Sequence, residues 1–312
     1  MRVWRGLTVL AFGLALGLGI GVAQGAAAGC PEAAAKNDFL QVSTIRLWAG
    51  DAPGAKGTAC EDVPWLTVLP PQEGQGNGSA VIVFPGGAYM MEASNLEGRQ
   101  VANWFTSRGF TAFVLHYRLG KKYLLPVPLV DARRAVQLVR ARARDYHLKA
   151  DQIGVIGFSA GGHLAGLSST QFVAGKADAE DPIERESSRP DFAVLGYPWI
   201  GGVSTNKAHL TYCVLADVMD QCEALQKAYS PDMFVTKDTP PTFIYHTTDD
   251  SVVPVEQALK YYEALLGAGV PVEMHIFAHG QHGSGLGMGN PSLDQWPGLL
   301  ETWLRGRGLV GK

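Results

Sequence analysis

Charged side chains are scarce in this sequence, and their scarcity excludes several classes of protein. Only 18% of the 312 residues are charged and 46% are hydrophobic, a composition typical of a globular chain with a large core and not of a disordered one. The one basic stretch, Arg133 to Arg144, has helical spacing and is expected to form a solvated helix face. The formal net charge is −3, so the composition does not favour nucleic acid as a partner.

Motifs of metal, redox and phosphate sites are missing as well. The four cysteines contain no C-x-x-C pair, and no G-K-[ST] follows a glycine-rich loop. The sequence therefore implies neither a metal nor an organic cofactor.

An uncharged apolar run long enough to suggest a membrane occurs only at the N-terminus, from Leu7 to Val22. Arg2 and Arg5 precede it and small residues follow, which is the arrangement of an export signal. The run is short for a bilayer span and contains four glycines, so we expect cleavage after about residue 28 and no stable membrane association. The mature chain, residues 30–312, would lose two arginines and carry a formal charge of −5 in the periplasm or outside the cell.

Four cysteines in a chain predicted to be exported favour disulfides. We expect Cys30 to pair with Cys60 and Cys213 with Cys222, because each pairing closes a local loop, while buried free thiols are the alternative. The letters AAGC before Cys30 loosely resemble a lipobox. Ala27 stands where leucine is usual, so lipidation is the less favoured interpretation.

Short apolar runs alternate with segments of helical period from residue 80 onward, which predicts an α/β domain with a mostly parallel sheet covered by helices on both faces. The predicted buried strands are 80–84, 111–117, 153–157, 192–197, 242–246 and 272–277. The predicted helices are 101–109, 132–146, 255–266 and 297–304. Edge strands are expected at 42–48 and 64–70, and surface insertions at 171–190 and 201–237. No repeat or linker is evident, so a single domain is expected.

One serine stands alone among small residues. The letters GFSAG (157–161) are the only G-x-S-x-G stretch of the chain, and they lie between a predicted strand and a predicted helix. In a nucleophile elbow the serine backbone is strained, and the residues two positions away must be small so that strand and helix can approach. Ser159 is therefore predicted to be a nucleophile at the carboxyl edge of the sheet, with a structural turn as the alternative.

A serine nucleophile needs a base and a group that orients the base, and in this architecture the acid and then the histidine follow later strands. Asp250, in a D-x-x-V-P arrangement, is the predicted acid, and Asp249 is the alternative unless it only caps a turn. His282, in a glycine-flanked loop, is the predicted base, and His279 is the alternative.

Two other histidines have packing explanations. His163 lies one turn beyond the serine, where helix packing accounts for it, and His116 lies inside a predicted strand, where we expect a core position.

A glycine-rich turn after the first buried strand, in VIVFPGGAYM, predicts a cradle for the negative oxygen of a tetrahedral intermediate. The expected donors are the N–H groups of Ala160 and Gly87, with that of Ala88 as a further candidate. A tight turn without a ligand is the alternative.

Three large side chains follow predicted strand ends on the same side of the sheet: Tyr89, Met90 and Trp199. They are candidates to line a substrate pocket or to stack on a sugar ring. Packing in the core or at the rim is the equally supported alternative.

These motifs together resemble the α/β-hydrolases, and more narrowly the bacterial carbohydrate esterases with feruloyl or acetyl-xylan esterase-like members (BD-FAE-like). The resemblance lies in FPGGAYMMEASNLEGRQVANWFTSRGF, IGVIGFSAGGHLAG, SPDMFVTKDTPPTFIYHTTDDSVVP and HGQHGSGLG, within residues 80–287. It implies an α/β-hydrolase fold with little or no lid. It also implies that Ser159 is the nucleophile, Asp250 the acid and His282 the base.

The resemblance and the ordered set of three residues imply a secreted serine esterase that removes short acyl groups, acetyl above all, from carbohydrate esters such as acetylated xylan. Ser284 stands where an aromatic residue is common and Ala88 where a third glycine is usual, so the chemistry transfers more safely than the substrate. The alternatives are a feruloyl or aryl esterase, a serine peptidase or dienelactone-type hydrolase on the same fold, and a non-catalytic carbohydrate-binding protein.

Overall fold

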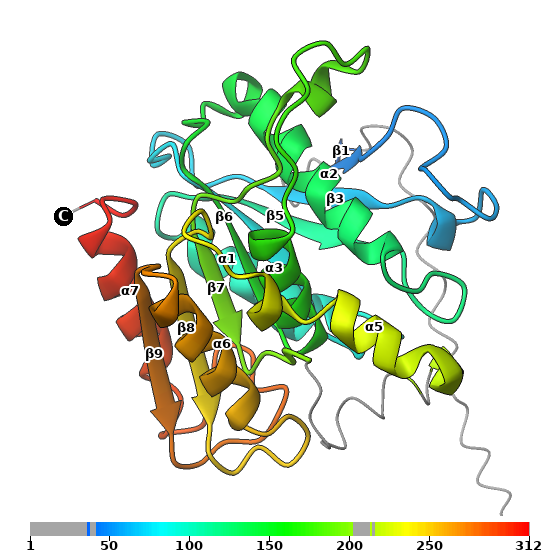
Figure 1. Cartoon of the computed structure of the whole chain (residues 1–312). Coiled ribbons are helices and arrows are strands. Elements are labelled where there is room, and N and C mark those ends of the chain that lie inside the picture. The colour runs from blue at the N-terminus through cyan, green and yellow to red at the C-terminus, as the bar shows by residue number, and fades with distance from the viewer. Residues whose placement is uncertain (1–35, 38–41, 202–212, 214–215, 312) are drawn as a thin grey trace, which may run out of the picture.

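The computed structural model describes residues 36–37, 42–201, 213 and 216–311, and these residues form a nine-stranded sheet between two sets of helices (Figure 1). The order of strands in the sheet is β1-β2-β3-β5-β4-β6-β7-β8-β9. The expected signal segment 1–28 and Cys30 lie outside the described residues, as does much of 202–215 in the second expected insertion.

The strands are β1 (Lys36–Asn37), β2 (Val42–Arg46), β3 (Trp65–Leu69), β4 (Ala80–Phe84), β5 (Thr111–His116), β6 (Ile153–Phe158), β7 (Ala193–Gly196), β8 (Thr242–Thr247) and β9 (Val272–Phe277). The six strands from β4 to β9 pair in parallel, whereas β1, β2 and β3 extend the sheet beyond β5 in antiparallel pairs. Every residue of β4, β6, β7 and β8 is buried, which explains the apolar runs of β4, β6 and β7 and the largely apolar start of β8. The predicted strands are confirmed with small changes at their ends.

The helices are α1 (Gln100–Thr106), α2 (Val127–Ala141), α3 (Ala160–Thr170), α5 (Cys222–Ala228), α6 (Glu256–Gly267) and α7 (Trp296–Gly306). Shorter turns of helix are η1 (Cys60–Asp62), η2 (Ser94–Arg99), η3 (Ala143–Tyr146), η4 (Pro182–Arg185), η5 (Met219–Gln221) and η6 (Pro231–Phe234), of which η2 is a π-helix and the others are 3-10 helices. Within the described part of the chain, no helix has the length and apolar character needed to cross a membrane.

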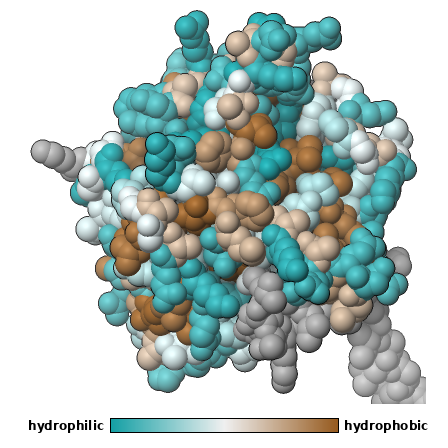
Figure 2. Space-filling view, in the orientation of Figure 1, coloured by the Kyte–Doolittle hydropathy of each residue, from teal (hydrophilic) through white to brown (hydrophobic). Residues whose placement is uncertain are grey.

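Two hydrophobic clusters fill the two faces of the sheet. Residues of α2, α3 and α6 belong to one cluster, and residues of α1 and α7 belong to the other. Side chains alternate between faces along a strand, so Ile82 and Phe84 of β4 enter the first cluster whereas Val81 and Val83 enter the second. The surface outside these clusters intersperses hydrophilic and hydrophobic residues over the face seen in Figure 2.

The basic stretch from Arg133 to Arg144 is solvated only in part: Arg142 and Arg144 are exposed, but the arginines within α2 are not. The guanidinium group of Arg134 is buried and pairs with Asp181 at 2.6 Å, and that of Arg140 pairs with Asp191 at 2.9 Å. Both acids come from the insertion at 171–190 or from the residue that follows it. The expectation was wrong for Arg134 and Arg140 because this insertion folds back over α2 and supplies carboxylates that periodicity alone does not reveal.

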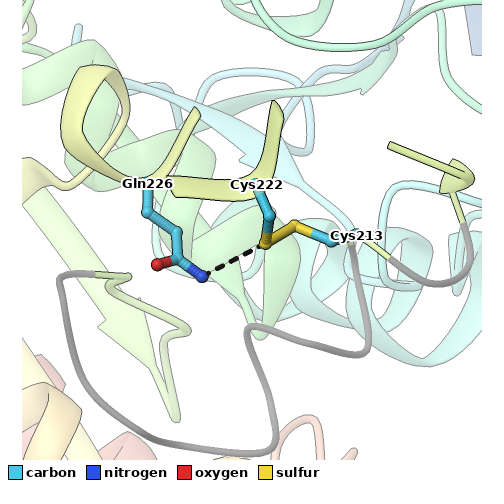
Figure 3. The surroundings of a disulfide bond; sticks show 3 residues. All are labelled: Cys213, Cys222 and Gln226. Carbon is cyan, nitrogen blue, oxygen red and sulfur yellow. Dashed lines mark hydrogen bonds between the residues drawn. A yellow bond between two sulfur atoms is a disulfide. The ribbon is translucent and has the colours of Figure 1, made fainter. Parts of the chain in front are cut away.

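A disulfide joins Cys213 to Cys222, the first residue of α5, and confirms that expected pairing (Figure 3). The amide Nε2 of Gln226, one turn along α5, lies 3.4 Å from Sγ of Cys222. Cys60 is also disulfide-bonded, and Cys30, the partner expected for it, lies outside the described residues.

Candidate active site

Ser159 occupies the sharp turn between β6 and α3. Its backbone has φ = 52° and ψ = −119°, a conformation that L residues rarely adopt and that costs about 1–3 kcal/mol. Backbone hydrogen bonds hold it: its N–H donates to the carbonyl of Gly196 at 3.1 Å, and its carbonyl accepts from the N–H of His163 at 2.9 Å. The strained turn therefore lifts the hydroxyl out of the sheet at its carboxyl edge.

Small residues two positions before and after the serine are required by contact between backbones. A Cβ on Gly157 would lie 2.0 Å from the carbonyl oxygen of Gly161, and a Cβ on Gly161 would lie 2.0 Å from that of Phe84. No side chain fits at either position, because β4, β6 and the start of α3 approach one another at backbone distance.

Three polar side chains from different strand ends form one hydrogen-bonded chain. The Oγ of Ser159 lies 2.8 Å from Nε2 of His282, and Nδ1 of the same ring lies 2.8 Å from Oδ2 of Asp250. Asp250 follows β8 and His282 follows β9, which are neighbours in the sheet (Figure 1). With a proton on Nδ1, the imidazole presents a bare Nε2 to the serine hydroxyl, which is the arrangement of a general base.

Hydrogen bonds keep the buried carboxylate of Asp250 ionised. Its Oδ1 accepts from the N–H groups of Val252 and Val253 at 2.9 Å each, and its Oδ2 lies 3.5 Å from Nε2 of His246 as well as near His282. Burial opposes the charge, but hydrogen bonds from His246, His282 and the backbone outweigh it and lower the pKa of Asp250 well below its usual range.

Sequence reasoning missed His246 as part of this arrangement. It lies within β8, is completely buried, and its Nε2 is 2.8 Å from the carbonyl oxygen of Val253. The signal for it was available, because a histidine in the apolar run TFIYH needs polar partners, and the acidic turn begins three residues later.

The alternative acid and base form a separate pair at the surface. Nδ1 of His279 lies 3.0 Å from Oδ2 of Asp249, and the other oxygen of Asp249 accepts the N–H of Gly280 at 2.8 Å. Both side chains are exposed, at 78% for His279 and 49% for Asp249. They brace the loop in which the histidine lies, while Asp250 and His282 are the residues brought to the serine.

The glycine-rich turn after β4 lies against the serine. A Cβ on Gly86 would come within 3.2 Å of Cβ of Ser159, so the loop backbone reaches the nucleophile only because this residue is glycine. The next residues, Gly87, Ala88 and Tyr89, all have positive φ values of 132°, 56° and 60°. This strained run forms a tight turn, closed by hydrogen bonds from the N–H groups of Met90 and Met91 to the carbonyl of Gly87.

Among the described residues, the predicted anion-binding N–H groups have no acceptor. Gly86 donates its N–H to the carboxylate of Glu97, whereas no hydrogen bond between described residues uses the N–H of Gly87, Ala88 or Ala160. The N–H of Ala160 is at the first position of α3, where helices leave donors free. These donors are thus available to an oxygen bound beside Ser159.

Comparison with known proteins places this arrangement in a family. The sequence model of the BD-FAE family matches residues 66–265, about two thirds of the chain, including the serine turn and Asp250. The chain belongs to the BD-FAE family. The matched range ends before His282, so its place in the site depends on the structure.

Two relatives of this BD-FAE chain have names that refer to xylan or its esters. An acetylxylan esterase of Xylanibacter ruminicola is 32% identical over 235 residues, which are 73% of this chain and 46% of that protein. An endo-1,4-beta-xylanase B of Butyrivibrio fibrisolvens is 36% identical over 207 residues, 65% of this chain and 32% of that protein. The chain therefore spans about half or less of these curated relatives.

A solved structure matches the chain over nearly its whole length. The acetyl ester-xyloside bifunctional hydrolase from Caldicellulosiruptor lactoaceticus superposes with a TM-score of 0.78 at 39% identity, covering 86% of this chain and 97% of that one. Structural neighbours of the chain are esterases with the α/β-hydrolase fold, and the predicted fold class is confirmed.

Two of the three residues proposed for a substrate pocket are buried. Tyr89 and Trp199 are 1% and 8% exposed and their rings are in edge contact at 6.1 Å. The hydroxyl of Tyr89 lies 2.7 Å from Nδ1 of His163, whose other nitrogen is 2.6 Å from the carbonyl oxygen of Tyr229. These side chains therefore pack against one another, which is the alternative given for them, and His163 packs with them.

His116 is not the core histidine that the sequence suggested. It is the last residue of β5, its side chain is 19% exposed, and its ring is stacked on that of Trp65 at 4.5 Å. Its nitrogens lie 2.9 Å from the carboxylate of Glu92 and 3.0 Å from the hydroxyl of Thr67. His116, Trp65 and Glu92 line a cavity of about 520 Å³ beyond the glycine-rich turn, together with Met90, the third proposed pocket residue. The strand ends here, so alternation no longer buries the side chain.

Proposed function

We propose that this chain is a serine esterase that removes short acyl groups, acetyl above all, from carbohydrate esters such as acetylated xylan or xylo-oligosaccharides. The observation that carries the proposal is the continuous hydrogen-bonded chain from Ser159 through His282 to Asp250. The BD-FAE family match and the names of the relatives support the ester and the carbohydrate parts of the substrate.

The first half of the reaction forms an acyl-enzyme. The Oγ of Ser159 attacks the ester carbonyl carbon while Nε2 of His282 takes its proton, and the carboxylate of Asp250 stabilises the imidazolium. The carbonyl oxygen becomes an oxyanion that accepts hydrogen bonds from the N–H of Ala160 and of Gly87 or Ala88. The bond to the sugar oxygen then breaks, and the imidazolium returns its proton to that oxygen as the alcohol leaves.

The second half releases the acid. A water molecule gives its proton to Nε2 of His282 and attacks the acyl carbon, and the second oxyanion occupies the same N–H groups. When the bond to Oγ breaks, the imidazolium protonates Ser159, and the carboxylic acid departs. One water is consumed for each ester cleaved.

The proposal extends to location and domain organisation. Residues 1–28 would act as an export signal, and residues 30–312 would form one catalytic domain in the periplasm or outside the cell. The disulfide between Cys213 and Cys222 supports this location, because disulfides persist in oxidising compartments.

Substrate profiling of the purified chain tests the activity. We expect the highest kcat/KM on acetylated xylan and on the acetyl member of a series of p-nitrophenyl esters, and no cleavage of peptide amides. Ser159→Ala should lower kcat by about 10³-fold or more, because removing the nucleophile leaves only binding and the oxyanion donors.

Ser168→Ala is the matched control for this variant. Ser168 lies on the same helix α3, is fully buried, and has no hydrogen-bond partner for its hydroxyl among the described residues, so kcat should stay within about 2-fold of wild type. Equal rates for Ser159→Ala and wild type on every ester would overturn the proposal. A preference for feruloyl esters or for peptide amides would show that the substrate is not an acetyl ester. The chain would then be a feruloyl esterase or a serine peptidase.

A further inference from the structure

A buried carboxylate that the mechanism does not use lies beneath the site. Glu97 is 3% exposed and belongs to the π-helical turn η2, where the N–H of Gln100 donates to the carbonyl of Asn95 five residues earlier. π-Helical turns of this kind are rare and often occur at functional sites. None of the ion pairs between described residues includes Glu97, although a buried charge without a partner is costly.

Each oxygen of this carboxylate holds a different part of the site. Oε2 accepts the N–H of Gly86 at 2.7 Å, and Oε1 accepts the hydroxyl of Tyr197 at 2.6 Å. A Cβ on Gly86 would lie 2.5 Å from Oε2, so the carboxylate fills the space left by the glycine. The first contact fixes the start of the glycine-rich turn that carries the anion-binding N–H groups.

The second contact reaches the histidine loop. The hydroxyl of Tyr197, which follows β7, accepts the N–H of Gly285 at 2.9 Å, three residues beyond His282. The ring of Tyr197 also meets the imidazole of His282 edge-on, with centroids 4.9 Å apart. The hydroxyl of Tyr245 donates to the carbonyl of Gly285 at 2.7 Å and completes the support of this loop.

Four titratable groups face the carboxylate of Glu97 from the elements around it. Tyr117 and Tyr197 face it from just after β5 and β7, Tyr245 faces it from within β8, and His282 faces it from the histidine loop. Burial raises the pKa of Glu97, while the hydrogen bonds from Tyr197 and Gly86 and the proximity of His282 oppose that effect. The imidazolium formed during the reaction is therefore the cation that can interact with Glu97 through an apolar, weakly screening environment.

We propose that Glu97 is a positioning residue for ester hydrolysis: its carboxylate aligns the glycine-rich turn and, through Tyr197, the histidine loop on Ser159, and its negative charge stabilises the imidazolium of His282. This inference rests on the proposed function. Glu97 would then hold both the oxyanion donors of the glycine-rich turn and the imidazole of His282 in position relative to Ser159.

Glu97→Gln distinguishes a role in aligning the site from a role in filling space. The substitution removes the charge and one hydrogen-bond acceptor but keeps the shape of the side chain. The amide oxygen can still accept from Gly86, but its NH₂ group faces the hydroxyl of Tyr197, which then accepts two hydrogen bonds and donates none at this site. We expect kcat on p-nitrophenyl acetate to fall about 10- to 100-fold with KM changed less than about 3-fold. The acid limb of the kcat/KM pH profile should move to lower pH, because the imidazolium loses a neighbouring negative charge.

Asp191→Asn is the matched control. Asp191 is also a largely buried carboxylate that accepts a backbone N–H, that of Ile153 at 2.9 Å, but Ile153 begins β6 and Ser159 follows its other end. This control should be less stable than wild type in urea unfolding, yet keep the wild-type kcat and the wild-type acid limb of the kcat/KM pH profile.

Tyr197→Phe, which keeps the contact between Glu97 and Gly86, gives a second test if Glu97→Gln does not fold. It should lower kcat on its own, and its effect should be less than additive with Glu97→Gln, since both act through one network.

The outcomes are distinguishable from those of the proposed function. If wild type hydrolyses no ester and Ser159 is not labelled by a fluorophosphonate, the proposed function fails. If wild type is active and Glu97→Gln shows the same kcat and acid limb, only the role of Glu97 is wrong. A loss of kcat with an unmoved acid limb and additive effects would show that Glu97 has a packing role alone and would overturn the inference.

Discussion

At the scale of single residues, Asp249 and Asp250 are adjacent in one loop but have opposite surroundings. Asp250 is buried and accepts hydrogen bonds from His282 and from two backbone N–H groups, whereas Asp249 is half exposed and pairs with His279 at the surface. Their hydrogen bonds lower the pKa of both carboxyls, so charge alone does not distinguish them. The partner of each carboxylate is what differs.

Exchanging each aspartate for asparagine should give unequal effects. Asp250→Asn should lower kcat by about 10³- to 10⁴-fold, because the amide no longer holds His282 in the tautomer with a bare Nε2. Asp249→Asn should change kcat by less than about 3-fold, because an exposed pair contributes little. Initial rates on p-nitrophenyl acetate measure both effects, and equal losses for the two variants would contradict the assignment of Asp250.

At the scale of elements, the serine turn depends on how closely β6 and α3 approach. Gly157 lies against the carbonyl group of Gly161. A Cβ added to Gly157 would lie 2.0 Å from that carbonyl oxygen. Backbone atoms cannot yield as the tip of a side chain can, so the added methyl group must separate the strand from the helix. This contact is local in the chain but decisive for where Ser159 points.

Gly157→Ala should therefore destabilise the fold by about 3 kcal/mol or more and abolish activity in the fraction that remains folded. Gly298→Ala is the control, since Gly298 lies in α7 with no atom within 4 Å of an added Cβ, and it should be neutral or stabilising by up to about 1 kcal/mol. Urea unfolding followed by circular dichroism measures both changes. Equal stabilities of the two variants would show that the turn is not constrained in this way.

At the scale of the whole molecule, the disulfide links Cys213 to the start of α5 within the insertion after β7. Cys213 and Cys222 are nine residues apart, and closing a loop of this length should restrict the unfolded chain and stabilise the fold by about 2–3 kcal/mol. Replacing both cysteines by serine should lower the free energy of unfolding by that amount. Thermal unfolding with and without a reductant checks it, and an unchanged midpoint in both experiments would mean that the bond does not stabilise the fold.

Much of the architecture followed from local patterns. Strands such as β4 and β6 are buried on both faces, so their sequences are apolar throughout and are recognisable without knowing their neighbours. The serine turn was equally accessible, because its steric requirement falls on residues within two positions of Ser159. The order of acid and base along the chain followed from strands whose carboxyl ends share one edge of the sheet.

Long-range contacts decided what the patterns left open. Arg134 and Arg140 looked solvated because their carboxylate partners are about 50 residues away, and Tyr89 and Trp199 looked accessible because the packing that buries them joins distant strand ends. Glu97 gave no signal, since its partner Tyr197 is 100 residues further along the chain.

The sequence by itself determined the α/β architecture and the serine turn, because periodicity and sterics act between near neighbours. Only the tertiary structure decided which aspartate and histidine reach Ser159, and which buried carboxylate supports them. Those choices depend on distances between loops from different strands, and no spacing along the chain specifies such distances.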